Sequence, residues 1–150
     1  FSLIPQVDDF LEDGYTKEEH KMVNETRKIM HDNNLNISVT CVRVPIFYCH
    51  SESVSVDFED DIDIQEIVNL FSNADGIKLI NDGKNENYPT PSMVEGKDDI
   101  FIGRIRKDLG SSRGVNFWLV SDNLRKGAAL NAVQIMESAI KLGKIPNFVG

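Results

Sequence analysis

Cysteine, long apolar runs and clustered positive charge are all scarce in this chain of 150 residues. The two cysteines, Cys41 and Cys49, are too few for a disulfide framework and are expected to be reduced thiols. No apolar run approaches the roughly 20 residues that cross a bilayer, and the first residues do not have the pattern of a secretory signal. The sequence therefore predicts a soluble, cytoplasmic protein with no membrane partner.

Positive charge is also in the minority. The chain has 24 acidic and 16 basic residues, a net charge of -8, and no strip of basic residues interleaved with aromatics. Nucleic acid is therefore not an expected partner. The glycine-rich motifs of nucleotide-binding loops and the G-x-S-x-G motif of serine hydrolases are missing from the sequence as well.

What the chain does have is the composition of one ordinary globular domain, 41% hydrophobic and 27% charged. At this length a folded chain buries roughly 70% of the surface that its unfolded form exposes, so a core can form without disulfides or metal. The sequence begins with Phe1 rather than methionine. We therefore expect these residues to be one part of a longer protein.

Helical and strand patterns alternate along the chain. Thr16 and Glu19 form the S/T-x-x-E pattern of a capping box, and apolar residues then recur with helical spacing as far as Asp32. Strand patterns cover Asn36–Val44, Ser51–Phe58, Ile100–Lys107 and Val115–Val120. Further helices are predicted from Asp63 to about Asp75 and over Asn123–Leu142, with a surface loop over Asn81–Asp99. The prediction is an α+β domain, with helices packed on one face of a largely antiparallel, mixed sheet.

The pair Cys49-His50 is the first candidate for chemistry, because an imidazole beside a thiol can activate it as a nucleophile. In an extended segment, however, successive side chains point to opposite faces, which favours a buried structural cysteine. Arg43 and His50 are a second pair, suited to holding a carboxylate beside a proton-transfer group. They can share a site only if the strand is interrupted, for which Pro45 offers a reason. An exposed arginine and a structural histidine remain the alternative.

Charged side chains also line one border of the first predicted helix, where Glu18, Lys21 and Glu25 follow an i, i+3, i+7 spacing. They are able to bind a zwitterionic or phosphorylated small molecule, or simply to form ion pairs on a solvated helix rim. On the last predicted helix, small residues precede Asn131 and Gln134. This pattern permits close approach of either a neighbouring helix or a flat cofactor.

Several separated stretches resemble the aspartate-semialdehyde dehydrogenase family, in the family's order and spacing from about residue 4 to residue 140. The matching stretches are Glu18-Glu19-His20-Lys21-Met22, Asn24-Glu25-Thr26-Arg27-Lys28-Ile29, Cys41-Val42-Arg43-Val44-Pro45, His50-Ser51-Glu52, Gly103-Arg104-Ile105-Arg106-Lys107-Asp108 and Val120–Ala129 with Asn131. The resemblance implies the substrate-binding and dimerisation domain of that family, which has a glyceraldehyde-3-phosphate-dehydrogenase-like fold, and a homodimer. It also implies that the last helix, residues 123–142, packs toward a nucleotide-binding domain.

The same resemblance implies an NADP-dependent reaction that interconverts aspartyl phosphate and aspartate semialdehyde through a cysteine thioester, on the route to lysine, threonine and methionine. By position, Arg43 would bind the substrate carboxylate, Glu18 its amino group and Lys21 the phosphate, with His50 as general acid and base. Asn131 would lie near the nicotinamide. No metal site is implied.

Two parts of the family pattern are missing: the catalytic cysteine segment and the glycine-rich nucleotide-binding domain. Neither Cys41 nor Cys49 has the sequence setting of the family's nucleophile. These residues alone are therefore expected to be inactive as a dehydrogenase. The alternatives are a domain like that of N-acetyl-gamma-glutamyl-phosphate reductase, whose substrate has no free amine for Glu18, and a non-catalytic dimerisation module.

Overall fold

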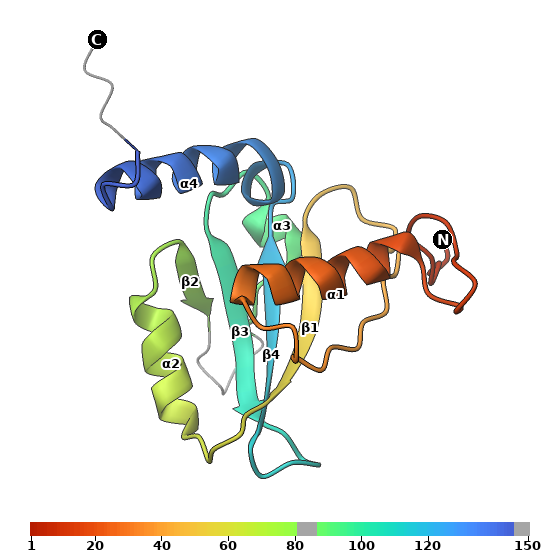
Figure 1. The fold of residues 1–150 in the computed structure, drawn as a ribbon, viewed down its shortest axis with the longest axis horizontal. Coiled ribbons are helices and arrows are strands. Elements are labelled where there is room, and N and C mark those ends of the chain that lie inside the picture. The colour runs from red at the N-terminus through yellow and green to blue at the C-terminus, as the bar shows by residue number, and fades with distance from the viewer. Residues whose placement is uncertain (81–86, 146–150) are drawn as a thin grey trace. The chain divides into compact units, whose positions relative to one another are not determined.

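The computed structural model describes residues 1–80 and 87–145 of the chain, which form two compact units, residues 1–46 and 47–150. The first unit contains α1 (Lys17–Met30), coloured orange in Figure 1. Its predicted capping box is confirmed: the Glu19 N–H donates to Thr16 Oγ1 at 3.3 Å, and the Thr16 N–H donates to Glu19 Oε2 at 2.8 Å. The helix ends at His31, whose left-handed φ of 55° turns the chain out of the helix.

The predicted strand Asn36–Val44 is wrong, because this part of the first unit is irregular. Arg43 forms only an isolated antiparallel bridge with Ile4, in which each backbone N–H donates to the other residue's carbonyl, at 2.8 and 3.0 Å. The Cys41 N–H donates to the side chain of Glu19 rather than to a neighbouring strand. β-Branched residues favour extended backbone, but a strand also needs a partner along its length.

The second unit is built on a four-stranded mixed sheet with the order β1-β4-β3-β2. β1 (His50–Asp57), β4 (Gly114–Ser121) and β3 (Ile100–Lys107) are antiparallel neighbours and confirm three predicted strands. β2 (Ile77–Ile80) pairs in parallel with β3 and was not predicted. Its four residues are too few for an alternating pattern to be recognised.

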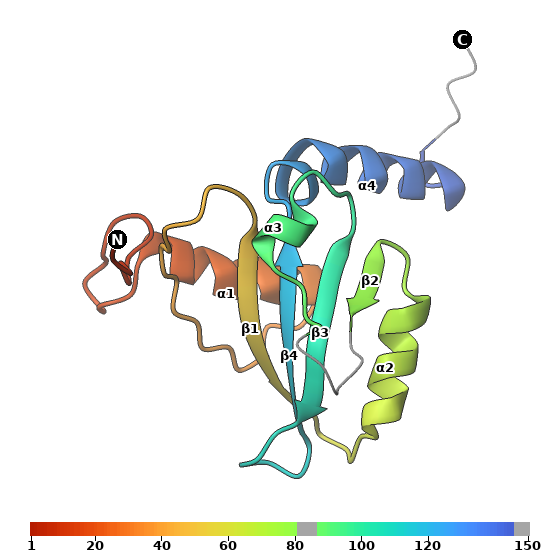
Figure 2. The ribbon, with the colours of Figure 1, turned by 180° about the vertical axis from the view of Figure 1, so that it is seen from behind.

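The two faces of this sheet carry two separate cores. On one face, α2 (Ile64–Asn73) places Ile67 against Ile102, Ile105 and Val115. On the other, α3 (Pro91–Val94) places the fully buried Val94 in a second buried cluster. Figure 2 shows α3 and α2 on different sides of the strands. The α+β class with a mixed sheet is confirmed. The prediction that the helices pack on one face is wrong, because α2 and α3 pack on different faces. The short helix α3 lies within the stretch predicted to be a loop. The predicted loop residues 81–86 lie outside the described part of the chain.

The second unit continues from β4 into the last helical region. The predicted helix Asn123–Leu142 is interrupted: a π-helical segment, Arg125–Ala129, has a non-helical Ala128 at φ -140° and ψ -113°, and α4 (Leu130–Lys141) follows. α4 lies across the end of the sheet at which β4 finishes and β1 and β3 begin (Figure 1). This arrangement places the start of β1 and the last helical region at the same end of the sheet.

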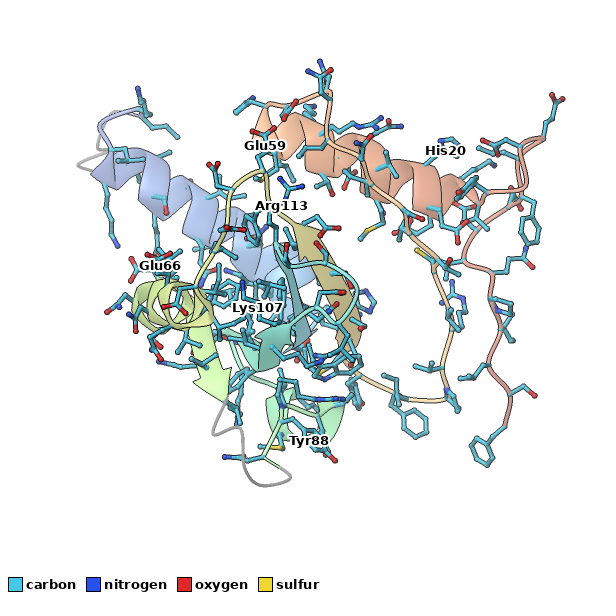
Figure 3. The ribbon with its side chains drawn as sticks, turned by 90° about the horizontal axis from the view of Figure 1, so that it is seen from below. His20, Glu59, Glu66, Tyr88, Lys107 and Arg113 are labelled. Atoms are coloured by element: carbon cyan, nitrogen blue, oxygen red, sulfur yellow. The ribbon has the colours of Figure 1, made fainter. Side chains whose placement is uncertain are left out.

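The opposite end of the sheet is held by side chains of the β3–β4 hairpin. Arg113 Nη1 donates to the Glu59 carbonyl at 2.5 Å, and Lys107 Nζ donates to the carbonyls of Ile62 and Ser112. Figure 3 shows Glu59, Arg113 and Lys107 gathered at this end. These bonds fix the segment that leads from β1 into α2.

Candidate functional site

The N-terminal half of α1 carries two of the predicted site residues, Glu18 and Lys21. Lys21 Nζ donates to both carboxylate oxygens of Glu18, at 2.9 Å each, as expected for an i, i+3 pair on a helix. The Glu18 side chain is 28% exposed and that of Lys21 is 52% exposed, so a small ligand can reach both. The hydrogen bond and the charge of Glu18 raise the pKa of Lys21, with a smaller contribution from Glu25, so this lysine carries its positive charge at neutral pH.

Between Glu18 and Lys21 in the sequence, Glu19 is buried, with 6% of its surface exposed. Its Oε2 accepts the Thr16 N–H at 2.8 Å, and its Oε1 accepts the Cys41 N–H at 2.9 Å. These two backbone hydrogen bonds lower the pKa of Glu19, so the side chain is a carboxylate at neutral pH. Glu19 therefore ties the start of α1 to the segment that contains Arg43.

Arg43, the third predicted site residue of the first unit, is exposed two residues beyond this attachment point. Its backbone is held by the bridge to Ile4, while its guanidinium carries five donors suited to a carboxylate. The predicted site residues of the first unit are thus one negative group, Glu18, and two positive groups, Lys21 and Arg43. This set is complementary to a small molecule that has an amine and two acidic groups.

In the second unit, His50 is the first residue of β1, opposite Ser121 of β4, and its side chain is exposed. The residue before it, Cys49, has a left-handed φ of 71°, which breaks the extended backbone at this point. The Cys49 N–H donates to Asn123 Oδ1 at 3.0 Å. Asn123 thus stabilises an uncommon conformation beside His50, a role for which the sequence offers no signal.

The buried side chain of Asp122 holds the backbone next to Asn123 in place. The Asp122 side chain is 4% exposed and accepts the backbone N–H groups of Gly96 at 2.8 Å, Leu124 at 2.9 Å and Arg125 at 3.3 Å. The Gly96 bond is the largest cause that lowers the pKa of Asp122. The carboxylate therefore holds the end of β4, the start of the last helical region and the loop after α3 together.

Cys49 itself is poorly suited to act as a nucleophile. Its side chain is 5% exposed within the cluster with Val94, Phe101 and Val120, and Sγ lies 3.6 Å from the Pro91 carbonyl oxygen. Burial, followed by the negative charges of Asp122 and Glu95, raises the pKa of the thiol. A buried thiol with a raised pKa has little thiolate at neutral pH, which supports its interpretation as a core residue.

Asn131, the last predicted site residue, lies in the first turn of α4. It lines an open hollow of about 400 Å³ with Lys126, Gln134 and Ser138, where Lys126 Nζ donates to Gln134 Oε1 at 2.6 Å. The hollow offers amide and ammonium groups, which can hydrogen-bond a carboxamide or an anionic group. Asn131 and His50 are thus placed at the same end of the sheet, one on α4 and the other at the start of β1.

Other classes of site find no support in the part of the chain that the structure describes. Within residues 1–80 and 87–145, no group of three or more histidine, cysteine or acidic side chains is placed to hold a metal ion. Across the same residues, no helix is both long enough and apolar enough to cross a membrane. The remaining candidates are the charged residues of the first unit and the polar residues at one end of the sheet in the second.

The structure defines an α+β domain whose exposed charged and polar side chains are candidates for binding a small molecule. Residues 1–126 match the family described as semialdehyde dehydrogenase, dimerisation domain, and the chain belongs to this family. The chain is 53% identical over 145 residues to the aspartate-semialdehyde dehydrogenase of Aquifex aeolicus, and 51% identical over 146 residues to that of Bacillus subtilis. Each alignment covers 97% of this chain, but 43% and 42% of the relative.

Solved structures show the same similarity. The crystal structure of aspartate semialdehyde dehydrogenase II from Vibrio cholerae matches with a TM-score of 0.88 and 45% identity, over 94% of this chain and 42% of that one. The structure of the same enzyme complexed with ASA matches with a TM-score of 0.87 and 45% identity, over 93% of this chain and 41% of that one. The chain therefore spans about two fifths of the length of the relatives it matches.

Proposed function

We propose that this chain is the substrate-binding and dimerisation part of an aspartate-semialdehyde dehydrogenase. In the reaction of such an enzyme, NADPH reduces aspartyl phosphate to aspartate semialdehyde, with release of phosphate. The observation that carries the proposal is the group Glu18, Lys21 and Arg43, which is accessible to solvent in a chain about half identical to two such enzymes. Its charges match the amine, the phosphate and the carboxylate of aspartyl phosphate.

Each charged residue has a role that follows from its chemistry. The Arg43 guanidinium binds the substrate carboxylate through two parallel N–H···O bonds. Glu18 accepts from the substrate ammonium, and Lys21 donates to phosphate. Because Lys21 donates to both oxygens of Glu18, a substrate ammonium that binds Glu18 would replace Lys21 there and leave Lys21 available to the phosphate. The ion pair thus keeps the two charges balanced until the substrate arrives.

His50 moves protons, because an exposed imidazole can both accept and donate a proton. As a base it accepts the proton of the attacking thiol, and as an acid it returns that proton to the thiolate when the aldehyde is released. The thiol belongs to neither Cys41 nor Cys49 in this proposal: Cys49 is buried, and neither has the family's sequence setting. The nucleophile is supplied by the rest of the full-length enzyme.

NADP, when bound, would supply the hydride-transfer chemistry, and most of its contacts would belong to the nucleotide-binding domain. In this chain the hollow at α4 fits one end of such a cofactor, because the Asn131 amide can hydrogen-bond a nicotinamide carboxamide. Asn131 would then orient the ring while His50 serves the substrate.

We also propose that α4 packs toward the nucleotide-binding domain and that the enzyme is a homodimer. Along α4, Val133, Ile135 and Met136 have 47%, 62% and 53% of their surface exposed. A helix with this much exposed apolar surface is suited to a covering partner. The dimer is supported by the family to which residues 1–126 belong.

The test uses the full-length protein that contains these residues, assayed for phosphate-dependent reduction of NADP with aspartate semialdehyde. His50→Ala is expected to lower kcat about a hundredfold or more, because general acid–base catalysis typically contributes 10²–10⁴-fold. Arg43→Ala is expected to raise KM for the semialdehyde, and Lys78→Ala, at an exposed position of β2, serves as the control with unchanged kinetics.

Three results would contradict the assignment. Full activity in both His50→Ala and Arg43→Ala would remove the proposed site. Activity with N-acetyl-glutamate semialdehyde in place of aspartate semialdehyde would favour the reductase alternative. A dimer without any dehydrogenase activity would favour the non-catalytic module.

A further inference from the structure

We propose that Glu19 is a positioning residue: its buried carboxylate fixes the segment that carries Arg43 to the helix that carries Glu18 and Lys21. The inference rests on the proposed function of those three residues as substrate ligands. Glu19 itself touches no substrate in this scheme. It acts by joining two pieces of the first unit that are far apart in the sequence.

The geometry that supports this role is a single carboxylate shared between two backbone amides. One oxygen accepts from Thr16 at 2.8 Å and the other from Cys41 at 2.9 Å, while the Glu19 side chain is almost completely enclosed. The Thr16 hydroxyl completes the capping box at 3.3 Å from the Glu19 N–H. The capping box accounts for one oxygen of Glu19 only, and the bond to Cys41 is additional to it.

The bond from Cys41 to Glu19 also restricts the position of Arg43, because the two residues are close in the sequence. Cys41 lies two residues before Arg43, so the Arg43 Cα is at most about 7 Å from the attachment point, at the maximal 3.3–3.6 Å per residue. On the helix side, Glu19 lies next to Glu18 and two residues before Lys21. Each proposed substrate ligand of the first unit therefore lies within two residues of either Glu19 or Cys41, the two residues that this hydrogen bond joins.

Two other pairs of hydrogen bonds hold this part of the first unit, but neither pair reaches the helix near Glu18. Arg27 donates through Nε and Nη2 to the Leu35 carbonyl, at 3.0 and 2.8 Å, close to the C-terminal end of α1. The bridge between Ile4 and Arg43 joins the segment to the N-terminal residues. Of the hydrogen bonds described for residues 1–46, the one from Cys41 to Glu19 joins this segment to the first turns of α1.

A carboxylate is required at this position because both partners are N–H donors. A glutamine side chain has one acceptor oxygen and one NH₂ donor, so Glu19→Gln places a donor against a donor at one of the two amides. Glu19→Asp shortens the side chain by one methylene, so the carboxylate no longer reaches both amides. Both substitutions keep a polar side chain of similar size and leave Glu18 and Lys21 unchanged.

The experiment compares three variants of the full-length enzyme: Glu19→Gln, Glu19→Asp and Thr16→Ala. Thr16→Ala is the matched control, because it removes the hydroxyl of the capping box but leaves both backbone N–H donors to the Glu19 carboxylate in place. Both Glu19 variants are expected to raise KM for aspartate semialdehyde about tenfold or more with little change in kcat, since a misplaced ligand of about 1 Å can cost up to a hundredfold. Thr16→Ala is expected to lower thermal stability and to keep the parental KM.

A second measurement follows the Cys41 amide by hydrogen exchange in the 150-residue chain and needs no activity. Its exchange is expected to be at least about tenfold faster in the Glu19 variants than in the parent and in Thr16→Ala. Inactivity of the parent enzyme would overturn the proposed function, while this readout would still test the bridge. In an active enzyme, a parental KM in both Glu19 variants, or an equal rise of KM in Thr16→Ala, would overturn the positioning role. If one Glu19 variant fails to fold, the other decides.

Discussion

Among the glycines that the structure describes, Gly103 is the one at which an added methyl group is expected to lower stability most. It lies in β3 opposite Trp118 of β4 and Ile80 of β2. A Cβ atom built there would overlap the Ile80 backbone carbonyl oxygen and would come within 2.6 Å of Pro89 Cδ. Real Cβ atoms essentially never approach so closely, and neither a backbone carbonyl in a sheet nor a proline ring can rotate away.

The magnitude follows from the cost of overpacking. Forcing an extra methyl group into a close-packed region costs about 1–3 kcal/mol, and here both neighbours are rigid, so the upper half of that range applies. Alanine also loses less backbone entropy on folding than glycine, which offsets about 0.5–1 kcal/mol. The expected net loss for Gly103→Ala is about 2 kcal/mol. For a domain of this size the midpoint of thermal unfolding should fall by about 4–8 °C.

Thermal and urea unfolding of the 150-residue chain, followed by circular dichroism, test this prediction. Gly127→Ala is the control, because its added Cβ would meet Asn123 Cβ at an ordinary 3.9 Å. The control should be more stable than the parent by up to about 0.5–1 kcal/mol, because alanine loses less backbone entropy than glycine and its added Cβ meets no close contact. Equal stability of Gly103→Ala and Gly127→Ala would contradict the close approach of Ile80 and Pro89 to Gly103.

Two further predictions concern buried titratable groups. Cys49 should react with iodoacetamide at neutral pH far more slowly in the folded chain than in urea, because burial raises the pKa of its thiol. Mass spectrometry distinguishes the labelling of Cys49 from that of Cys41. Equal rates in the folded and unfolded states would contradict this prediction. Asp122→Asn should lower the stability of the chain at pH 7, because an amide cannot accept all three backbone N–H groups. The folded-state pKa of Asp122 is lowered, so its contribution is complete above the unfolded value of about 3.8 and is lost as the pH falls through the lower folded value. The difference between variant and parent should therefore shrink in unfolding measurements below about pH 3.8, and a constant difference would refute this reasoning.

Local sequence signals were sufficient where one segment alone determines the structure. The capping pattern of Thr16 and Glu19 correctly placed the start of α1, because both halves of that motif lie within four residues. The alternation in β1 and the apolar pattern of β3 and β4 likewise marked strands of eight residues each. The family was also recognisable, because its motifs are short stretches of chemically specific residues in a constant order.

Prediction from the sequence failed where the outcome depended on partners distant in the chain. Asn36–Val44 has strand-like residues but lacks a neighbouring strand along its length, and Glu19 binds one of its amides. β2 has only four residues and is defined by its pairing with β3. The last helix is interrupted at Ala128, for which we have no local explanation in the sequence.

The sequence by itself determined the family, the identities of the charged residues and the elements with strong local periodicity. Only the tertiary structure showed that Glu19 is buried while Glu18 is accessible, although the two are adjacent on one helix. The same holds for Cys49, enclosed beside an exposed His50. The physical reason is that burial and hydrogen bonding depend on which distant segment covers a side chain. Residue type and local spacing state what a side chain can do, and its surroundings in the fold decide which of those possibilities it uses.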